Sequence, residues 1–232
     1  VTRTVVGKPV AQFWGLKTAG LFQSDEEAAN YVNDKGERLQ PAAAAGDLKY
    51  IDWNGDGQIN EDDKTFIGSS IPSASVGLKI GMTYKGFDFS MLLQGDLGVD
   101  VYNNYKQTLL AGKALHNQMD DIKNAFRAEA VTFTTAGGET ISLPANRNTS
   151  IPRIIQSDPN ANSTRASDYF VADASYIRCN NITLCYTLPK TLLSKSKVEN
   201  LRIYTDLKNP CTITHYTMFD PQVPNGGSTL NR

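Results

Sequence analysis

Two neighbouring stretches of the chain alternate apolar and polar residues with a period of two. Apolar side chains occupy every second position from Val76 to Tyr84 and again from Phe87 to Leu93. A period of two is the pattern of a β-strand whose two faces have different surroundings. Because only residues 85–86 separate the stretches, we predict a β-hairpin with a tight turn.

The same alternation returns twice in the last quarter of the chain, at residues 181–188 and 201–208. Pro189 ends the first of these stretches, and a lysine-rich segment, residues 190–200, connects it to the second. The sequence therefore predicts four strands, each with one apolar and one polar face.

Long polar segments separate these strands. Residues 25–46 and 105–164 lack strand periodicity, and only residues 117–130 have some helical character. Such long loops are uncommon in compact soluble domains, whereas outer-membrane barrels pair short turns on one side with long external loops on the other. The pattern favours an all-β fold of antiparallel strands from a barrel, with a soluble β-sandwich as the alternative.

Composition excludes several classes of protein. With 23 basic and 24 acidic residues, the chain has a net charge of −1 and no basic excess that would attract nucleic acid. No apolar run approaches the roughly 20 residues of a membrane-spanning helix, and residues 1–16 lack the order of a signal peptide. We therefore expect neither a nucleic-acid partner nor a helical membrane protein.

The three cysteines, without a CxxC spacing, predict neither a disulfide framework nor a zinc site. Cys179 and Cys185 fall on one predicted strand, where about 3.3 Å per residue separates them by roughly 20 Å. That distance is too long for a bond between them. We interpret all three cysteines as small apolar fillers.

One segment, residues 52–63, has the spacing of a calcium-binding loop. Calcium takes six to eight oxygen ligands, and Gly57 at the sixth position permits the sharp turn that such a loop needs. We predict a structural calcium site here; the alternative is a metal-free turn rich in Asx and glycine. The candidate ligands are Asp52, Asn54, Asp56, Gln58 through its backbone carbonyl, Asn60 and Asp63.

The loop differs from an EF-hand in two respects. Asp63 stands at the twelfth position, where an EF-hand has a bidentate glutamate, and residues 48–51 before the loop read as extended rather than helical. We therefore expect a structural staple rather than a sensor that opens and closes.

Catalytic patterns are missing from the sequence. His116 and His215 are the only histidines, and neither belongs to a nucleophile or metal-binding motif. The glycines at residues 95–98 do not lead into a phosphate-binding motif. The chain is therefore not predicted to be an enzyme.

Several segments, in this order and spacing, resemble the C-terminal region of the SusC/RagA family of TonB-linked outer-membrane transporters. Together they cover most of the chain from Gly20 to about Asp220, and their combination is far more specific than any one of them. The segments are residues 20–25, 46–57, 62–68, 84–90, 93–95, 150–153, 167–178, 181–189 and 200–204.

The resemblance implies an outer-membrane β-barrel of about 22 strands with a plug and long extracellular loops. It implies that residues 1–232 are the C-terminal part of the barrel, with residues 52–63 in an extracellular loop and the plug and remaining strands absent. Apolar strand faces would contact outer-membrane lipid. The implied partners are a SusD-like surface lipoprotein, the TonB complex and a glycan or peptide substrate.

The chain departs from the family pattern at its cysteines, and a second function is compatible with the sequence. The three cysteines, Cys179, Cys185 and Cys211, replace an apolar residue, a glycine and an aromatic residue of the family pattern. The alternative function is a soluble, secreted, calcium-stapled β-domain that binds glycan.

Overall fold

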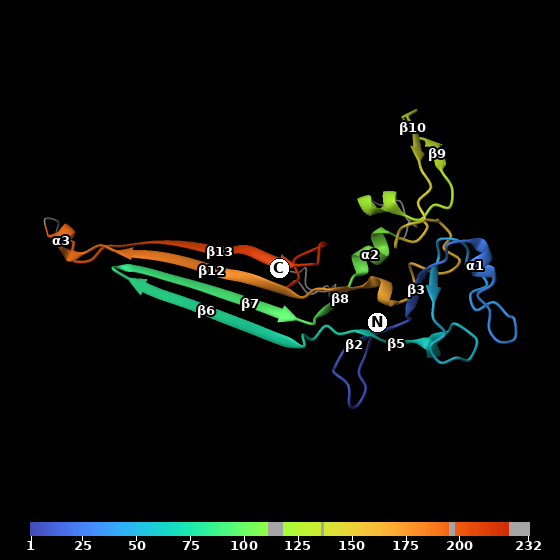
Figure 1. Cartoon of the computed structure of the whole chain (residues 1–232), viewed down its shortest axis with the longest axis horizontal. Helices are drawn as coiled ribbons and strands as arrows, with labels where there is room; N and C mark the ends of the chain where they lie inside the picture. Colours follow the sequence, from blue (N-terminus) through green and yellow to red (C-terminus); the bar gives the residue numbers. More distant parts are fainter. Residues whose placement is uncertain (111–117, 136, 195–197, 223–232) are drawn as a thin grey trace. The chain divides into compact units, whose positions relative to one another are not determined.

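The computed structural model describes residues 1–110, 118–135, 137–194 and 198–222. His116 and the first residue of the stretch predicted to be helical lie outside these ranges. The described chain is mostly β-strand in antiparallel sheets with a few short helices, which confirms the predicted fold class (Figure 1). None of the helices within these ranges has the length and apolar character needed to cross a bilayer.

The chain forms two compact units. The first consists of Val1–Gly68 and Tyr102–Ala172, and the second of Ser69–Val101 and Asp173–Arg232. Two short strands, β8 (Asp100–Tyr102) and β11 (Val171–Asp173), pair with each other.

The second unit is built on one long antiparallel sheet (Figure 1). Its order is β13-β12-β7-β6, and these are the four strands predicted from periodicity, most of them longer than predicted. Their bounds are β6 (Ala74–Tyr84), β7 (Phe87–Leu97), β12 (Tyr176–Thr187) and β13 (Arg202–Thr214).

The predicted tight turn joins β6 to β7. Lys85 and Gly86 both adopt positive φ, at 45° and 86°, as the two-residue turns that match strand twist require. The Gly86 carbonyl accepts a hydrogen bond from the Thr187 amide at 2.8 Å, which ties the turn to the end of β12. A side chain at Gly86 would approach the Thr187 carbonyl to 2.9 Å, so glycine is required here.

Short connections and long segments lie at opposite ends of this sheet. The turn at residues 85–86 and the connection 188–201, which contains α3 (Lys190–Leu193), share one end (Figure 1). Ala74 pairs with Leu97 at the other end, where Tyr176 pairs with Asp96 and Thr214. The long segments before β6 and between β7 and β12 therefore join the sheet at this second end.

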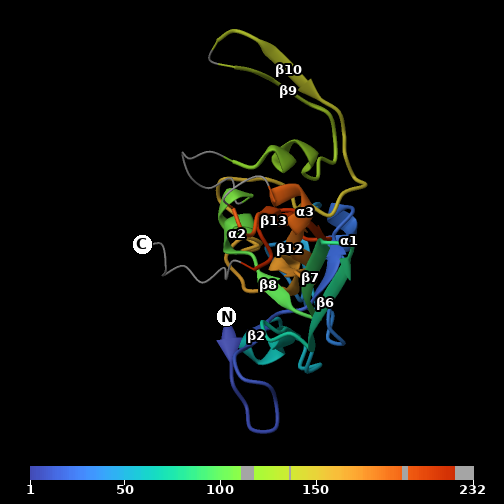
Figure 2. The ribbon, with the colours of Figure 1, turned by 90° about the vertical axis from the view of Figure 1, so that its left-hand side faces the viewer.

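The first unit contains short strands in three small sheets and several single-turn helices. The hairpin β9–β10 extends from it as a two-stranded arm (Figure 2). The strands are β1 (Thr2–Arg3), β2 (Gln12–Gly15), β3 (Thr18–Leu21), β4 (Leu48–Tyr50), β5 (Thr65–Gly68), β9 (Val131–Thr134) and β10 (Thr140–Leu143). The helices are α1 (Asp25–Ala29), α2 (Asn104–Leu109) and the 3-10 turns η1 (Glu61–Asp63), η2 (Asp120–Asn124) and η3 (Asp168–Phe170).

Two features of this unit differ from the sequence expectations. The helical character expected at residues 117–130 amounts, within the described part, to the single turn η2. The segment 105–164, expected to be loop, contains a hairpin and most of α2. Elements of three to six residues are too short to produce a clear period.

Three buried apolar clusters stabilise the first unit, and they are the only ones found within the described ranges. One contains Leu16, Leu21, Leu48, Tyr50 and Phe126, a second contains Phe13, Tyr102 and Phe170, and a third contains Phe22, Ala28 and Ala43. The first two clusters join segments more than 75 residues apart, such as Leu48 and Phe126 or Phe13 and Tyr102, and so hold the loop-rich unit together.

Gly46 offers a test of this packing. Its φ of +85° is unfavourable for any other residue, and a methyl group there would strike the Phe126 ring and lie 2.9 Å from Arg153 Cβ. Gly36 has a similar φ of +78° with open space around it. Gly36→Ala should cost about 1 to 2 kcal/mol for the backbone alone, whereas Gly46→Ala should cost roughly 1 to 3 kcal/mol more through overpacking.

Hydrogen exchange of the full-length protein, followed by mass spectrometry, measures the difference in protection between the two variants. The Gly46 amide, which donates to the Phe22 carbonyl at 2.7 Å, should lose protection in Gly46→Ala far more than in Gly36→Ala. Equal loss in the two variants would show that the Phe126 contact is unimportant.

Candidate functional site

The register of the long sheet places its apolar residues on one face. Ile80 of β6 pairs with Met91 of β7, which pairs with Ile182 of β12, which pairs with Leu207 of β13. The same alignment holds along most of the sheet. The apolar face consists of Val76, Leu78, Ile80, Met82, Tyr84, Phe87, Phe89, Met91, Leu93, Ile177, Cys179, Ile182, Leu184, Tyr186, Ile203, Leu207, Cys211 and Ile213.

This apolar face is largely uncovered by the described chain. All eleven residues of β6 are exposed, and Leu78, Met82 and Ile213 are 54 %, 64 % and 71 % exposed. Soluble proteins rarely expose a contiguous apolar surface of more than a few hundred Å². The sheet therefore needs an apolar environment from outside this chain.

The opposite face carries polar side chains that bond to one another. Asp88 accepts hydrogen bonds from Thr83 at 2.9 Å and Arg202 at 3.2 Å, and Thr183 donates to Asp206 at 2.8 Å. These groups suit contact with water. The sheet thus separates a polar side from an apolar side, as predicted for Val76, Leu78, Ile80 and their neighbours.

Arg178 joins the polar face to the segment that follows β13. Its guanidinium donates to Thr212 at 2.8 Å, to Gln222 at 2.6 Å and to Asp220 at 2.6 Å. The Gln222 amide also donates to the Tyr176 hydroxyl at 2.7 Å. Residues 220–222 are therefore held against the sheet by a buried arginine.

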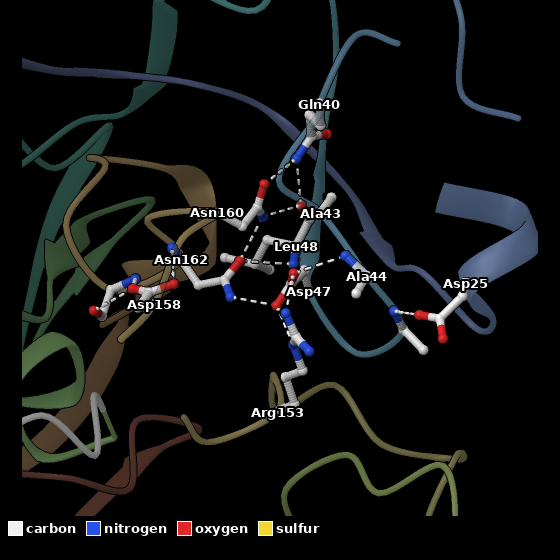
Figure 3. Close-up of polar contacts among 12 residues, drawn as sticks. Asp25, Gln40, Ala43, Ala44, Asp47, Leu48, Arg153, Asp158, Asn160 and Asn162 are labelled. Carbon is white, nitrogen blue, oxygen red and sulfur yellow. Dashed lines mark hydrogen bonds and ion pairs between the residues drawn. The ribbon is translucent and has the colours of Figure 1, made fainter. Parts of the chain in front are cut away.

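A second polar site lies inside the first unit and centres on Asp47 (Figure 3). This carboxylate is 0 % exposed and accepts two hydrogen bonds from the Arg153 guanidinium, at 2.7 and 2.9 Å. It also accepts from the Asn162 side chain at 2.8 Å and from the Ala44 amide at 2.9 Å. The buried charge is thus paired and fully hydrogen-bonded, as burial requires.

Side-chain amides around Asp47 bond to the backbone of β4, which has a strand neighbour on one side only (Figure 3). The Leu48 amide donates to Asn162 at 2.9 Å, and the Leu48 carbonyl accepts from Gln40 at 2.9 Å and from Asn160 at 3.0 Å. The Tyr50 amide donates to Gln40 at 2.8 Å. These amides take the place of a second neighbouring strand and fix the position of β4.

The predicted calcium loop, residues 52–63, directly follows this fixed strand. The extended segment expected before the loop is β4, and Gly57 has the positive φ, 83°, expected of it. Asp52 closes the turn, since its two carboxylate oxygens accept hydrogen bonds from the amides of Gly55 at 2.7 Å and Gly57 at 2.8 Å.

Asp63 closes the other end of the loop. Although 0 % exposed, it accepts hydrogen bonds from the Trp53 amide at 2.8 Å, the Asn54 amide at 3.3 Å and the Asn60 amide at 2.7 Å. Asn60 in turn caps η1 by accepting from the Asp62 amide at 2.6 Å. Asp63 therefore joins the first and last thirds of the loop.

Asp56 lies at the exposed tip. Its carboxylate accepts hydrogen bonds from the side chains of Asn54 at 3.1 Å and Asn60 at 3.3 Å, and from the Gln58 amide at 2.9 Å. These donors, the Asn54 amide first, lower the pKa of Asp56 below its usual range. These hydrogen bonds therefore favour the ionised form of the Asp56 carboxylate.

The arrangement fits a cation only in part. Within the described ranges, no three carboxylate, imidazole or thiol groups converge on one point, and the loop carboxylates accept amide hydrogen bonds instead. Each carboxylate oxygen has a second lone pair, so the donor set matches calcium in chemistry. Calcium binding stays a prediction.

The sequence did not predict the hydrogen-bond network around Asp47 or the hydrogen bonds from Arg178 to Thr212, Asp220 and Gln222. Asp47 and Arg153 are 106 residues apart in the chain, and Arg178 and Asp220 are 42 apart. Asp47, Arg153 and Arg178 lie in segments that resemble the SusC/RagA family, and that was the only signal in the sequence that marked them.

Curated relatives of the chain share one name. No family model matches it. It is 30 % identical over 228 residues to TonB-dependent receptor P26 of Formosa agariphila, covering 97 % of this chain and 20 % of that relative. It is 30 % identical over 178 residues to TonB-dependent receptor SusC of Bacteroides thetaiotaomicron, covering 76 % of this chain and 15 % of that relative. The chain spans about a fifth or less of these relatives.

Solved structures show a similar fold. The RagAB peptide transporter matches with a TM-score of 0.61 and 21 % identity, over 91 % of this chain and 20 % of that chain. The RagAB peptide importer in its open-open state matches with a TM-score of 0.62 and 21 % identity, over 93 % of this chain and 20 % of that chain. At 21 % identity, the similarity to these structures establishes the fold alone.

Together these findings identify the class as outer-membrane β-barrel proteins that are not enzymes. The chain belongs to the SusC/RagA type of TonB-dependent receptor. The predicted family, location and lack of enzymatic activity are therefore confirmed, and the alternative of a soluble, secreted domain is not favoured.

Breaking the Asp47 ion pair should loosen the first unit. Arg153→Ala leaves a buried carboxylate without its counter-ion, and we expect a loss of about 3 kcal/mol, the low end for a buried pair, because Asn162 and Ala44 still donate. That loss corresponds to a roughly hundredfold larger fraction of open molecules. Protease cleavage of the full-length receptor within residues 1–68 should accelerate accordingly.

A matched control is Arg147→Ala, which removes an exposed guanidinium that donates only to the Ala128 carbonyl among its described contacts. Its cleavage rate should stay close to that of the unmodified receptor. If both variants are cleaved at the same rate, the Asp47 network does not hold the unit together.

Proposed function

We propose that this chain is the C-terminal barrel segment of a TonB-dependent transporter that imports oligosaccharides or other large nutrients across the outer membrane. The observation that supports it most directly is the four-stranded sheet with one polar face and one exposed apolar face. Its strands of 11 to 13 residues are as long as or longer than the roughly 9 to 11 residues that a tilted strand needs to cross a bilayer. In this proposal the apolar face contacts lipid and the polar face lines the lumen.

The ends of the sheet support an orientation. Outer-membrane barrels have short periplasmic turns and long extracellular loops. We therefore assign the end with the turn at residues 85–86 and the connection 188–201 to the periplasmic side. Residues 98–175, which leave the opposite end, and the calcium-like loop 52–63 are then extracellular. The exposed rings of Tyr84 and Phe87 at the turn suit the aromatic girdle of such barrels.

The partners in this proposal follow from family membership. They are a SusD-like surface lipoprotein, with which the receptor would capture a glycan or peptide, and the TonB complex, which would act through parts of the protein beyond this segment. The relative called SusC and the RagAB peptide transporter support this class of partner and leave both kinds of substrate in the proposal.

Calcium is the proposed ligand of the loop at residues 52–63. Asp52, Asn54, Asp56, Asp63 and the Gln58 carbonyl would supply oxygen to one ion, and the ion would stiffen a loop that the carboxylates already close. The support is the spacing of the oxygen groups, the positive φ of Gly57 and the anchoring of the loop by β4. Its role would be structural.

Two neighbouring substitutions on β7 test the membrane assignment. Met91 lies on the apolar face and Ser90 on the polar face. Met91→Arg places a charge toward lipid, at about 2 to 4 kcal/mol near the midplane, so we expect little folded receptor in the outer membrane. Ser90→Arg should assemble normally because it faces water. Heat-dependent gel migration of outer-membrane fractions reports the folded barrel.

Growth of the same strains tests transport. Cells that lack the gene are complemented with each version and grown on a panel of oligosaccharides or peptides as sole nutrient. The unmodified receptor and Ser90→Arg should restore growth that Met91→Arg does not, while all strains grow on the monomers. Equal assembly of the two variants contradicts the lipid-facing assignment, and growth that never depends on the receptor contradicts import.

Terbium, which replaces calcium in such loops, tests the metal site. Trp53 lies within the loop, so its excitation should sensitise terbium emission in the full-length receptor. Asp56→Asn should lower the emission, while Asp34→Asn, an exposed carboxylate outside the loop, should leave it unchanged. Excess calcium should displace terbium from the loop and so lower the emission. Identical emission from both variants would show that residues 52–63 do not hold the ion.

The pH dependence has a defined sign. The pKa of Asp56 is lowered in the folded loop, so the carboxylate stays charged as the pH falls into the ordinary range of aspartate. Protonation of Asp56 should therefore not lower terbium emission within that range and should do so only below it.

A further inference from the structure

Two of the three cysteines face each other across neighbouring strands. Cys179 of β12 pairs directly with Cys211 of β13 in the antiparallel ladder, and both thiols are free in the structure. Both residues lie on the apolar face, because the rows that contain them align with Leu93 of β7. Sequence spacing gave no sign of this pairing, since the partners are 32 positions apart.

The geometry of the pair suits a disulfide. Directly opposed residues of antiparallel strands have Cα atoms about 4.5 or 5.5 Å apart, depending on the type of pair. Both values lie within the range of about 4.4 to 6.8 Å that a disulfide spans. Cys185 has no such partner, because it lies opposite Tyr204 and Asp88, on the polar face.

The backbone next to the pair is irregular. The register of β12 and β13 shifts between Cys179 and Asn181, and Asn209 adopts a φ of 49° on the opposite strand. Pro210, beside Cys211, has no amide hydrogen to donate to the ladder. A covalent link at this position would join the strands where hydrogen bonding between them is interrupted.

We propose that Cys179 and Cys211 form a cross-strand disulfide as the receptor passes through the periplasm, an oxidising compartment. The oxidant is a disulfide-bearing oxidoreductase. The exposed Cys211 thiolate attacks one sulfur of that disulfide, forms a mixed disulfide and releases the first oxidoreductase thiolate. Cys179, only 2 % exposed, then attacks Cys211 Sγ and releases the second thiolate.

Electrons and protons balance in this thiol–disulfide exchange. The receptor loses two electrons and two thiol protons, and the oxidoreductase disulfide is reduced to two thiols. The overall balance is the same whichever of the two thiolates attacks first. Cys185, buried on the other face, stays a thiol.

Peptide mapping of the full-length receptor tests the link. Outer membranes are isolated with a thiol-blocking maleimide present, and the receptor is digested with trypsin without reductant. Cleavage after Arg178, Lys190, Lys208 and Arg232 gives one peptide with Cys179 and Cys185 and another with Cys211. We expect these two peptides to be linked to each other, to separate on reduction, and to carry the maleimide on Cys185.

Two serine variants show which cysteine is bonded to Cys211. Cys185→Ser should retain the link, whereas Cys179→Ser should lose it and leave Cys211 labelled by the maleimide. Recovery of unlinked peptides with all three cysteines labelled overturns the proposal, and so does a link that persists in Cys179→Ser. Fragment ions from the unmodified receptor locate the bond even if a variant fails to fold, and the readout is independent of nutrient uptake.

Discussion

The structure depends on a mismatch between the two faces of one sheet. The apolar side chains of β6, β7, β12 and β13 are largely uncovered by the described residues of their own chain, while their polar neighbours bond to one another on the reverse side. A sheet of this kind needs an apolar cover on one face and water on the other, as the proposed contact with lipid would provide. Its outer strands β6 and β13 also need further strands to satisfy their free edges. In an outer-membrane barrel of this family, the membrane would cover the apolar face and the remaining strands would pair with both edges.

The first unit follows the rules of water-soluble proteins. Small apolar clusters form its cores, and where strands are too few, side-chain amides complete the backbone hydrogen bonding, as Gln40, Asn160 and Asn162 do for β4. Asp47 and Arg153 connect this network to a distant part of the chain. The position of the calcium-like loop at residues 52–63 therefore depends on contacts made far from it in the sequence.

Sequence reasoning recovered what is local and repetitive. The alternation around Ile80 and Met91 predicted the long strands and the apolar side of each, and the Lys85–Gly86 pair predicted the turn. Apart from β4, which was expected as an extended segment, strands of two to four residues were missed because they contain too few positions for a period. Pairing between distant strands was missed as well, and with it the meeting of Cys179 with Cys211 and of Asp47 with Arg153.

Strands β7 and β12 are neighbours in the sheet although residues 98–175 lie between them. The entropy of closing a flexible loop grows only with the logarithm of its length, by about 0.6 kcal/mol for each doubling. Insertions or deletions within residues 98–175 therefore change the cost of joining these strands very little, while the side-chain rows keep the register. In the proposed barrel, the extracellular segment 98–175 can therefore be exchanged or lengthened during evolution while the pairing of β7 with β12 is kept.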